Sequence, residues 1–382
     1  MSAHSRLAPS AAGRWVFCPG SVALSEEFPQ LIENDSAPEG VAAHWVVSSM
    51  LTTHAPLVGE IAPNGIAVTE EMIDGALLYY NFVFKLANPH GGLKVRFRWE
   101  EPEVMPSIHP EMWGTPDGAG LLDIVELTGE LHITDYKFGH GEVSPVENWQ
   151  LASYARGVLD RMQFDGHAEQ HIRIHLHIVQ PRCYTSAGPI RSWSCTAADM
   201  RAMWNKLHDA GHEALSPNPR FRVGDHCRYC PGRRACAELK RQSAWIQDYA
   251  EYQQPIELPV GALGLELAFV ERSLAMLEAR ATGLREQTEA NIRAGQSVPG
   301  WGMAPGQSRT TWNVPVSEVH ALGEAMGVDL RKEAAPTPKQ AEQIFKKAGI
   351  DASIIEAYSS TNPGGLKLVP AAQTLAKKAF GA

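Results

Sequence analysis

The sequence predicts an α/β fold in which helices cover a central sheet. Segments with the spacing of amphipathic helices alternate with short segments whose apolar residues recur at every second position, the pattern of a half-buried strand. After two helices, the chain is predicted to form three strands, a helix, a strand and a further helix. One sheet with helices packed on it is the most economical way to bury these elements.

The bulk composition is that of an ordinary globular protein. The chain has 382 residues, enough for two or more compact units, and its 44% apolar and 20% charged residues argue against disorder. No apolar run approaches the roughly 20 residues of a membrane helix, and the first residues lack the apolar stretch of a signal peptide. We therefore expect a cytoplasmic protein without a membrane partner, whose six cysteines serve as thiols or metal ligands.

The charge balance limits the classes of partner. A net charge of −9 counts against a large non-specific DNA-binding surface. It does not exclude a nuclease, because acidic metal ligands add negative charge to the chain. A local basic stripe and the bound cations can still attract phosphate.

Two helices are predicted before the first strand. Ser36 and Glu39 have the spacing of a capping box, in which each side chain bonds the backbone of the other, so a helix is expected over about 37–52. Thr69 is a candidate N-cap for a second helix over about 70–87.

Strands and helices then alternate. Residues 94–100 alternate apolar and charged side chains, and 121–127 and 131–138 are predicted to form a hairpin turned at Thr128-Gly129-Glu130. A helix is expected over about 146–162, a strand over 171–178, and a helix over 197–214 with Thr196 as its N-cap.

The chain is predicted to divide near residue 252. Residues 1–252 would hold the sheet and a loop rich in Arg and Cys, 218–241, that leads into a helix. Residues 253–382 are expected to be mainly helical, with a long helix over about 260–293, a strand near 299–313 and a short helix starting at Thr337. The long helix is expected to pack on the first unit or on another subunit, which leaves homo-oligomer formation open.

Two aspartates and a lysine are the strongest candidates for chemistry. Asp135 and Lys137 share one face of a predicted strand, and Asp117 starts the preceding strand, so a hairpin can bring the two carboxylates together. With the Tyr136 carbonyl they would form an oxygen site suited to Mg²⁺ or Mn²⁺. Such an ion polarises a phosphodiester and acidifies an attacking water.

The remaining candidates support this site. Lys137 would orient or deprotonate the water or stabilise charge on the phosphate, and two neighbouring carboxylates favour the protonated lysine and hence the electrostatic role. Gln150 and Tyr154 are four residues apart on a predicted helix and therefore lie on one face. The alternative is that these residues have no catalytic role. An Asp-x-Lys on a strand usually lies on a solvated face, and an Asp in a Gly/Pro turn is usually a turn residue.

The ordered set resembles the PD-(D/E)xK nucleases, in particular their RecB-like exonuclease branch. Asp117, Asp135 and Lys137 match the catalytic triad, with Asp in place of the commoner Glu, and Gln150-x-x-x-Tyr154 matches the helical motif of the branch. The resemblance covers about residues 5–245. It implies a restriction-endonuclease-like core, a central mixed sheet flanked by helices, and catalytic roles for these five residues.

A further part of the resemblance concerns the N-terminal region. His44, five residues after Glu39, matches an upstream histidine that some members use as an extra metal ligand. Pro9-Ser10-Ala11 and Cys18-Pro19-Gly20-Ser21 are similar to motifs of an uncharacterised phage and prophage nuclease family. A helix histidine that is hydrogen-bonded in the core is the alternative for His44.

Four of the cysteines could together bind a metal. Cys227-x-x-Cys230-x₅-Cys236 and the distant Cys18 leave both Zn²⁺ and a [4Fe–4S] cluster open, since each takes four thiolates. The layout resembles iron–sulfur nucleases of the AddB and CRISPR-associated kinds, in which one cysteine precedes the core and three follow it. That likeness implies an iron–sulfur clamp across the nuclease domain. Four unrelated buried thiols are the alternative.

A row of histidines could be taken for a zinc site, but the sequence does not favour this interpretation. His171, His175 and His177 occur at alternate positions of one predicted strand. Because no carboxylate lies near them in the sequence, we expect a row that faces solvent or DNA.

The resemblance implies a metal-dependent deoxyribonuclease, an exonuclease rather than an endonuclease, in phage DNA recombination or processing. Its implied partners are single- or double-stranded DNA ends and a single-strand-annealing protein or a helicase. Two alternatives stay open from the residues alone: a non-catalytic DNA-binding or adaptor protein, and a zinc-clamped RNA-processing nuclease.

Overall fold

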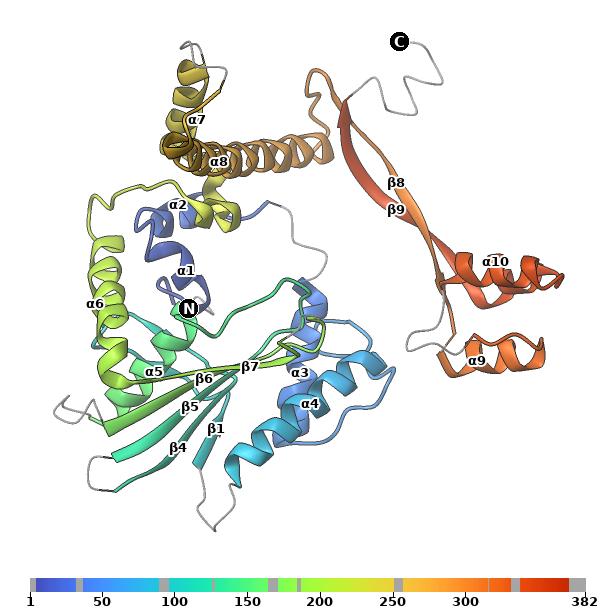
Figure 1. Ribbon diagram of the computed structural model, residues 1–382, viewed down its shortest axis with the longest axis horizontal. Helices are drawn as coiled ribbons and strands as arrows, with labels where there is room; N and C mark the ends of the chain where they lie inside the picture. Colours follow the sequence, from blue (N-terminus) through green and yellow to red (C-terminus); the bar gives the residue numbers. More distant parts are fainter. Residues whose placement is uncertain are drawn as a thin grey trace. The chain divides into compact units, whose positions relative to one another are not determined.

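A mixed five-stranded sheet lies at the centre of the first part of the chain in the computed structural model (Figure 1). Its order is β1-β4-β5-β6-β7, and only β5 and β6 run parallel. Parallel neighbours need a crossover, which the α-helix α5 (Trp149–Arg161) provides. The strands are β1 (Arg96–Trp99), β4 (Gly118–Val125), β5 (Thr128–Tyr136), β6 (Ile172–Val179) and β7 (Ile190–Thr196).

Helices cover both faces of this sheet. Leu131 and Ile133 of β5 point to one face and join the apolar core built with α5 and α6 (Ala197–Ala214). Tyr136, at an alternate position, joins a second core with α3 (Ala37–Thr52) and α4 (Glu70–Ala87). Figure 1 shows these two helix pairs on opposite sides of the strands. The predicted α/β class, with a mixed sheet flanked by helices, is confirmed.

The structure describes residues 5–31, 37–88, 96–125, 128–163, 171–183, 187–250, 257–314, 316–330 and 337–370. By its contacts the chain divides into two units, Met1–Leu284 and Arg285–Ala382. The sequence predicts a division near residue 252. The later division has a physical reason: Met276 and Ala279 of α8 (Val260–Arg293) pack against the cysteine segment.

Helix starts follow the capping residues closely. Thr69 accepts a hydrogen bond from the Met72 amide, and Thr196 forms a capping box with Asp199. α5 begins at Trp149, three residues later than predicted, because the Asn148 side chain caps it. Ser36, the first residue of the predicted capping box, lies outside the described residues.

Two strand predictions are wrong in detail. Thr128-Gly129-Glu130 is not the turn of the hairpin, since these residues begin β5 and Thr128 pairs with Val125 of β4. β7 was not predicted, because its polar alternation is short and its Ser and Cys residues weaken the apolar signal. A separate small sheet is formed by β2 (Glu103–Val104) and β3 (Trp113–Gly114).

The N-terminal helices lie beside the cysteine segment. The Gly20 amide donates to the Arg220 carbonyl at 3.0 Å, and Gly232 packs so closely on Leu24 that a Cβ there would overlap it. Two segments that are roughly 200 residues apart in the sequence are thereby brought together. The elements involved are η1 (Pro9–Ala11), α1 (Ala12–Trp15), α2 (Ser21–Glu27), η3 (Asp225–Tyr229), η4 (Pro231–Arg234) and α7 (Ala237–Ala250).

The second unit is built on a long two-stranded ribbon of β8 (Trp301–Trp312) and β9 (Ser359–Pro370). α9 (Val316–Ala325), α10 (Pro338–Lys347) and η5 (Ala352–Tyr358) share a small core that includes Val319, Phe345 and Ile355. The predicted long helix, the strand near 299–313 and the helix at Pro338 are confirmed. β9 was not predicted, because its Asn-Pro-Gly-Gly stretch is typical of a turn. None of the helices in the described ranges combines the length and the apolarity of a membrane span.

Arg182 links the two helices of one face to the sheet. Its guanidinium nitrogens donate to both carboxylate oxygens of Glu39 in α3, at 2.8 and 2.7 Å, and to Glu71 in α4 at 2.6 Å. The guanidinium also lies 3.8 Å from the ring centroid of Phe138. We expect Arg182→Met to lower the free energy of unfolding by about 2 kcal/mol, the scale of hydrogen bonds to charged groups.

Urea denaturation checks this expectation, with the exposed Arg173→Met on β6 as the matched control. Equal stability of the two variants would contradict a clamping role for Arg182.

Candidate active site

Asp117 and Asp135 meet at one end of the β4–β5 hairpin. Gly118 of β4 pairs with Thr134 of β5, which places Asp117 beside the end of β5. The Oδ2 atom of Asp117 accepts a hydrogen bond from the Tyr136 amide at 2.6 Å. A Cβ at Gly118 would overlap the Thr134 hydroxyl, so glycine permits this close approach of the strands.

Asp135, Lys137 and Gln150 form a closed polar triangle. The Lys137 Nζ atom lies 2.9 Å from Asp135 Oδ2 and 3.1 Å from Oδ1, and it donates to Gln150 Oε1 at 3.2 Å. Gln150 Nε2 in turn donates to Asp135 Oδ1 at 3.0 Å. The first turn of α5 is therefore tied to the end of β5.

Tyr154 lies one helical turn beyond Gln150, as the spacing predicts. Its side chain is buried and is hydrogen-bonded to Gln150. Burial and the two nearby carboxylates raise the pKa of Tyr154, so its hydroxyl stays protonated. Tyr154 packs near Gly114, where a Cβ would lie 3.1 Å from its ring. These contacts fix the position of Gln150.

His44 reaches the same place from the helix pair on the other face of the sheet. Its Nδ1 atom lies 3.4 Å from Asp117 Oδ1, and its ring packs edge-on against Tyr136 with centroids 5.4 Å apart. Residues from α3, β4, β5 and α5 thus converge at one end of the sheet. The predicted residues are brought together, while their chemical roles stay predictions.

The environment of this cluster shifts the pKa values of the two carboxyl groups in opposite directions. Burial and the Asp117 charge raise the pKa of Asp135, although Lys137 opposes them. Burial also acts to raise the pKa of Asp117, but His44, Lys137 and the Tyr136 amide outweigh it and lower the pKa. Burial acts to lower the pKa of Lys137, yet the two carboxylates raise it overall, so Lys137 stays charged at neutral pH.

The donor set fits a hard divalent cation. Asp135 Oδ2 is buried and accepts no aligned hydrogen bond from the described residues, although Lys137 Nζ is its ion-pair partner at 2.9 Å. A carboxylate oxygen in a buried site is the kind of ligand that Mg²⁺ and Mn²⁺ take. The Tyr136 carbonyl remains a predicted third ligand, and the structure adds that its amide orients Asp117.

The four predicted cysteines also come together. Cys18, Cys227, Cys230 and Cys236 are all buried free thiols that line one small cavity. Backbone amides donate to the Sγ atoms of Cys18 and Cys236, each at 3.4 Å, as occurs around metal-bound thiolates. Burial raises the pKa of Cys227 to about 12, so a bound metal is what would hold it deprotonated. The set fits both a [4Fe–4S] cluster and Zn²⁺.

A groove beside the cysteine segment was not predicted. Three arginines, Arg14, Arg222 and Arg272, and several aromatic side chains line it, together with acidic residues. Phe17 connects the groove to the carboxylates, since its ring meets Trp149 edge-on with centroids 5.7 Å apart and Trp149 directly precedes Gln150. The aromatic lining is Phe17, Phe221, Tyr229 and Phe269. No sequence spacing relates these residues, because three separate segments supply them.

The sequence predicts that the histidine row faces solvent or DNA, and this prediction is wrong. His132 of β5 joins His175 and His177 of β6 in a stack, and His132 and His177 are buried. His171 precedes β6 and is exposed. The prediction failed because β5 pairs in parallel with β6. This pairing places His132 and Glu130 of β5 beside the histidines of β6, which lie about 45 residues later in the sequence.

Residues 4–374 match a protein-family model whose description is "Protein of unknown function (DUF2800)". The match extends through both compact units.

Proposed function

We propose a function for this chain, which belongs to the DUF2800 family: it is a deoxyribonuclease that uses Mg²⁺ or Mn²⁺ to hydrolyse phosphodiesters. The observation that carries the proposal is the convergence of Asp117, Asp135, Lys137 and Gln150 at one end of the sheet. A buried carboxylate and a half-buried one beside a charged lysine are poorly explained as a solvated strand face. The mixed sheet order supports a restriction-endonuclease-like core.

Each side chain has a defined part in this proposal. A bound divalent ion supplies a Lewis acid for the phosphate and lowers the pKa of a bound water. Asp117 and Asp135 provide the anionic oxygens that hold it. Lys137, kept protonated by the two carboxylates, stabilises the negative charge that builds on the phosphate. Gln150 holds both Asp135 and Lys137 in place through its amide.

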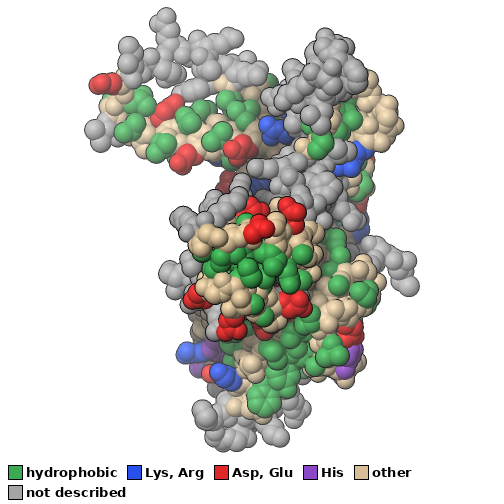
Figure 2. Space-filling model, turned by 90° about the vertical axis from the view of Figure 1, so that its right-hand side faces the viewer, with side chains coloured by type: hydrophobic (Ala, Val, Ile, Leu, Met, Phe, Trp, Pro, Cys, Tyr) green, Lys and Arg blue, Asp and Glu red, His purple; other side chains and the backbone are tan. Residues whose placement is uncertain are grey.

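DNA is the proposed substrate because of the groove next to the site. Arginines attract phosphates, and exposed aromatic rings stack on bases without regard to sequence. Tyr229 is 75% exposed and lies under the guanidinium of Arg228, at 5.7 Å from its centroid. The face in Figure 2 is a poor alternative, since among its described side chains Asp and Glu are scattered and Lys and Arg are few.

The four cysteines would serve as a structural clamp. We propose a [4Fe–4S] cluster there, with Zn²⁺ as the alternative, because the buried thiols and their N–H donors suit either. Such a clamp ties the segment around Cys18 to the segment around Cys227 and so fixes the groove between them. Action as an exonuclease in phage recombination, with an annealing protein or a helicase as partner, remains a proposal from resemblance.

End-labelled DNA tests the proposed function. Single- and double-stranded DNA and RNA of the same sequence are incubated with the purified chain and Mg²⁺ or Mn²⁺. We expect loss of DNA that EDTA stops, with RNA cut far more slowly. Intact DNA under all conditions would favour the non-catalytic adaptor, and preferential loss of RNA would favour the RNA-processing alternative.

The metal dependence of His44 variants tests the extra ligand. Burial acts to lower the pKa of His44, but the charge of Asp117 and its contact with the ring outweigh this and raise the pKa above its ordinary value of 6.5. A protonated ring binds no metal, so the Mn²⁺ concentration for half-maximal activity should rise as the pH falls through this pKa.

We expect His44→Gln to raise that concentration about tenfold and to flatten its pH dependence. The control His54→Gln, two residues beyond the C-terminal end of α3, should match the wild type. A His44→Gln profile that follows the wild-type curve would show that His44 is a core histidine.

A further inference from the structure

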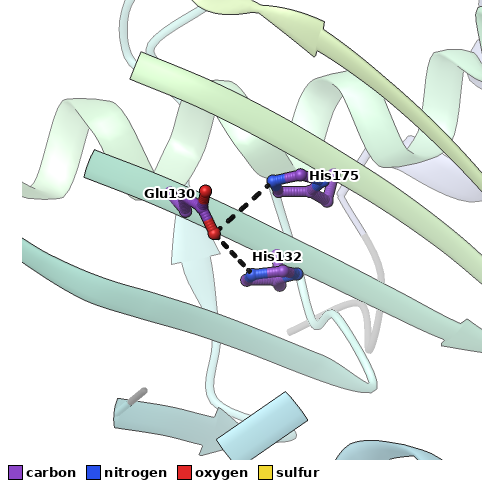
Figure 3. A group of neighbouring side chains, drawn as sticks. All are labelled: Glu130, His132 and His175. Carbon is purple, nitrogen blue, oxygen red and sulfur yellow. Dashed lines mark ion pairs between the residues drawn. The ribbon is translucent and has the colours of Figure 1, made fainter. Parts of the chain in front are cut away.

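A second cluster of metal-ligating side chains lies at the other end of β5. Glu130 and His132 are two residues apart on β5, and His175 is the parallel cross-strand partner of His132 on β6. One ligand atom from each residue lies within 4.8 Å of the other two. Figure 3 shows the carboxylate of Glu130 beside the two rings, with an ion pair drawn to each of them.

Hydrogen bonds orient both imidazoles toward Glu130. His175 Nδ1 lies 2.7 Å from the Ser194 hydroxyl, and His132 Nδ1 lies 3.0 Å from His177 Nε2. His177 Nδ1 is 2.7 Å from the Ser192 hydroxyl. With the proton on Nδ1, the Nε2 lone pair of His175 is left for a ligand. Metal-binding histidines usually donate their other N–H in this way.

One atom in the cluster lacks a hydrogen bond. His175 Nε2 is buried and has no hydrogen-bond partner among the described residues, and its contact with Glu130 Oε2 is 3.8 Å long. Burial of a polar nitrogen without a partner is costly, and such atoms in a native fold often mark a missing ion or water.

The spacing is close to that of a bound transition metal. Glu130 Oε2 lies 3.8 Å from the Nε2 atoms of both His132 and His175. Tetrahedral zinc with bonds near 2.1 Å holds its ligand atoms about 3.4 Å apart, so the carboxylate needs to move by a few tenths of an ångström. The rings are stacked at 11°, so one must also turn about its soft terminal torsion to bring the lone pairs together.

We propose that Glu130, His132 and His175 bind a Zn²⁺-class ion, with water as the remaining ligand. Two imidazoles and one carboxylate are a borderline donor set that suits Zn²⁺ better than Mg²⁺. The site is separate from the candidate active site: Glu130 is five residues from Asp135 along an extended strand, about 16 Å, and faces the opposite side of the sheet. The ion would cross-link the two parallel strands.

Calorimetric titration of Zn²⁺ into the full-length protein, purified with its cysteine site loaded and held in excess Mg²⁺, tests the site. The wild type should bind one Zn²⁺ that Glu130→Gln no longer binds. Because the Glu130 side chain is 47% exposed, this substitution should leave the fold intact. Ser194→Ala, which removes only the partner of His175 Nδ1, should weaken binding about tenfold.

The exposed His171→Gln provides the matched control and should bind Zn²⁺ as the wild type does. Thermal unfolding without added zinc shows whether each variant is folded, and added zinc should raise the unfolding midpoint of the wild type but not of Glu130→Gln. Absence of Zn²⁺ binding by the wild type would overturn the proposal. Equal binding by wild type and Glu130→Gln would do so too.

Discussion

Replacing Asp135 by asparagine should lower the rate of Mg²⁺-dependent DNA hydrolysis by at least about 10³-fold. The substitution keeps the size of the side chain but removes an anionic oxygen that accepts no aligned hydrogen bond. It also removes the ion-pair partner of Lys137, which lies 2.9 Å away. Both the metal ligand and the electrostatic support of the lysine are lost together. Rates on end-labelled DNA at saturating Mg²⁺ give the measurement.

The matched control is Asp209→Asn, which alters a surface carboxylate of α6 that is 82% exposed. It should cut DNA at the wild-type rate. Lys137→Ala should lose activity while it retains divalent-ion binding, because its proposed role is to stabilise charge on the phosphate. An Asp135→Asn protein that is folded and nearly as fast as the wild type would contradict the proposed role of this carboxylate.

Replacing Cys236 by serine should remove the metal from the cysteine site and destabilise the fold. Cys236 is buried with Leu239 in an apolar cluster that also contains Met276 of the groove. Its Sγ atom accepts a hydrogen bond from the Leu239 amide. A clamp that closes a loop of roughly 200 residues stabilises the chain by on the order of 5 kcal/mol in the chain-entropy picture. Iron and zinc analysis and the thermal unfolding midpoint measure the two effects.

Cys183→Ser is the control, since Cys183 is an equally buried free cysteine outside the cluster. It should keep the full metal content of the wild type. Iron with visible absorption in the wild type supports the [4Fe–4S] assignment, and zinc alone supports the alternative at the same residues. A metal-free wild type that is as stable as Cys236→Ser would mean that the four cysteines are ordinary buried thiols.

The candidate active site could be predicted because its members belong to local patterns. Asp135 and Lys137 share a strand face, and Gln150 and Tyr154 share a helix face, so periodicity alone places each pair. The short hairpin connection then brings Asp117 to the end of β5. Strand and helix ends were less predictable, because capping by Asn148 and the pairing of Thr128 depend on tertiary contacts.

What the sequence could not predict depends on pairing across long separations. Glu130 and His175 become neighbours only because β5 and β6 run parallel in one register, and no spacing in the sequence indicates that register. The groove has the same origin, since Phe17, Phe221 and Arg272 come from distant segments. The alternating histidines of one predicted strand, together with His132 on another, were the available signal for the Glu130 cluster.

Diffraction at the manganese edge from crystals soaked in Mn²⁺ tests the central claim most directly. We expect an anomalous peak within bonding distance of carboxylate oxygens of both Asp117 and Asp135, and no such peak in crystals of Asp135→Asn. A wild-type protein with no peak between these two carboxylates, even where Mn²⁺ is bound elsewhere, would contradict a metal-dependent nuclease at this site.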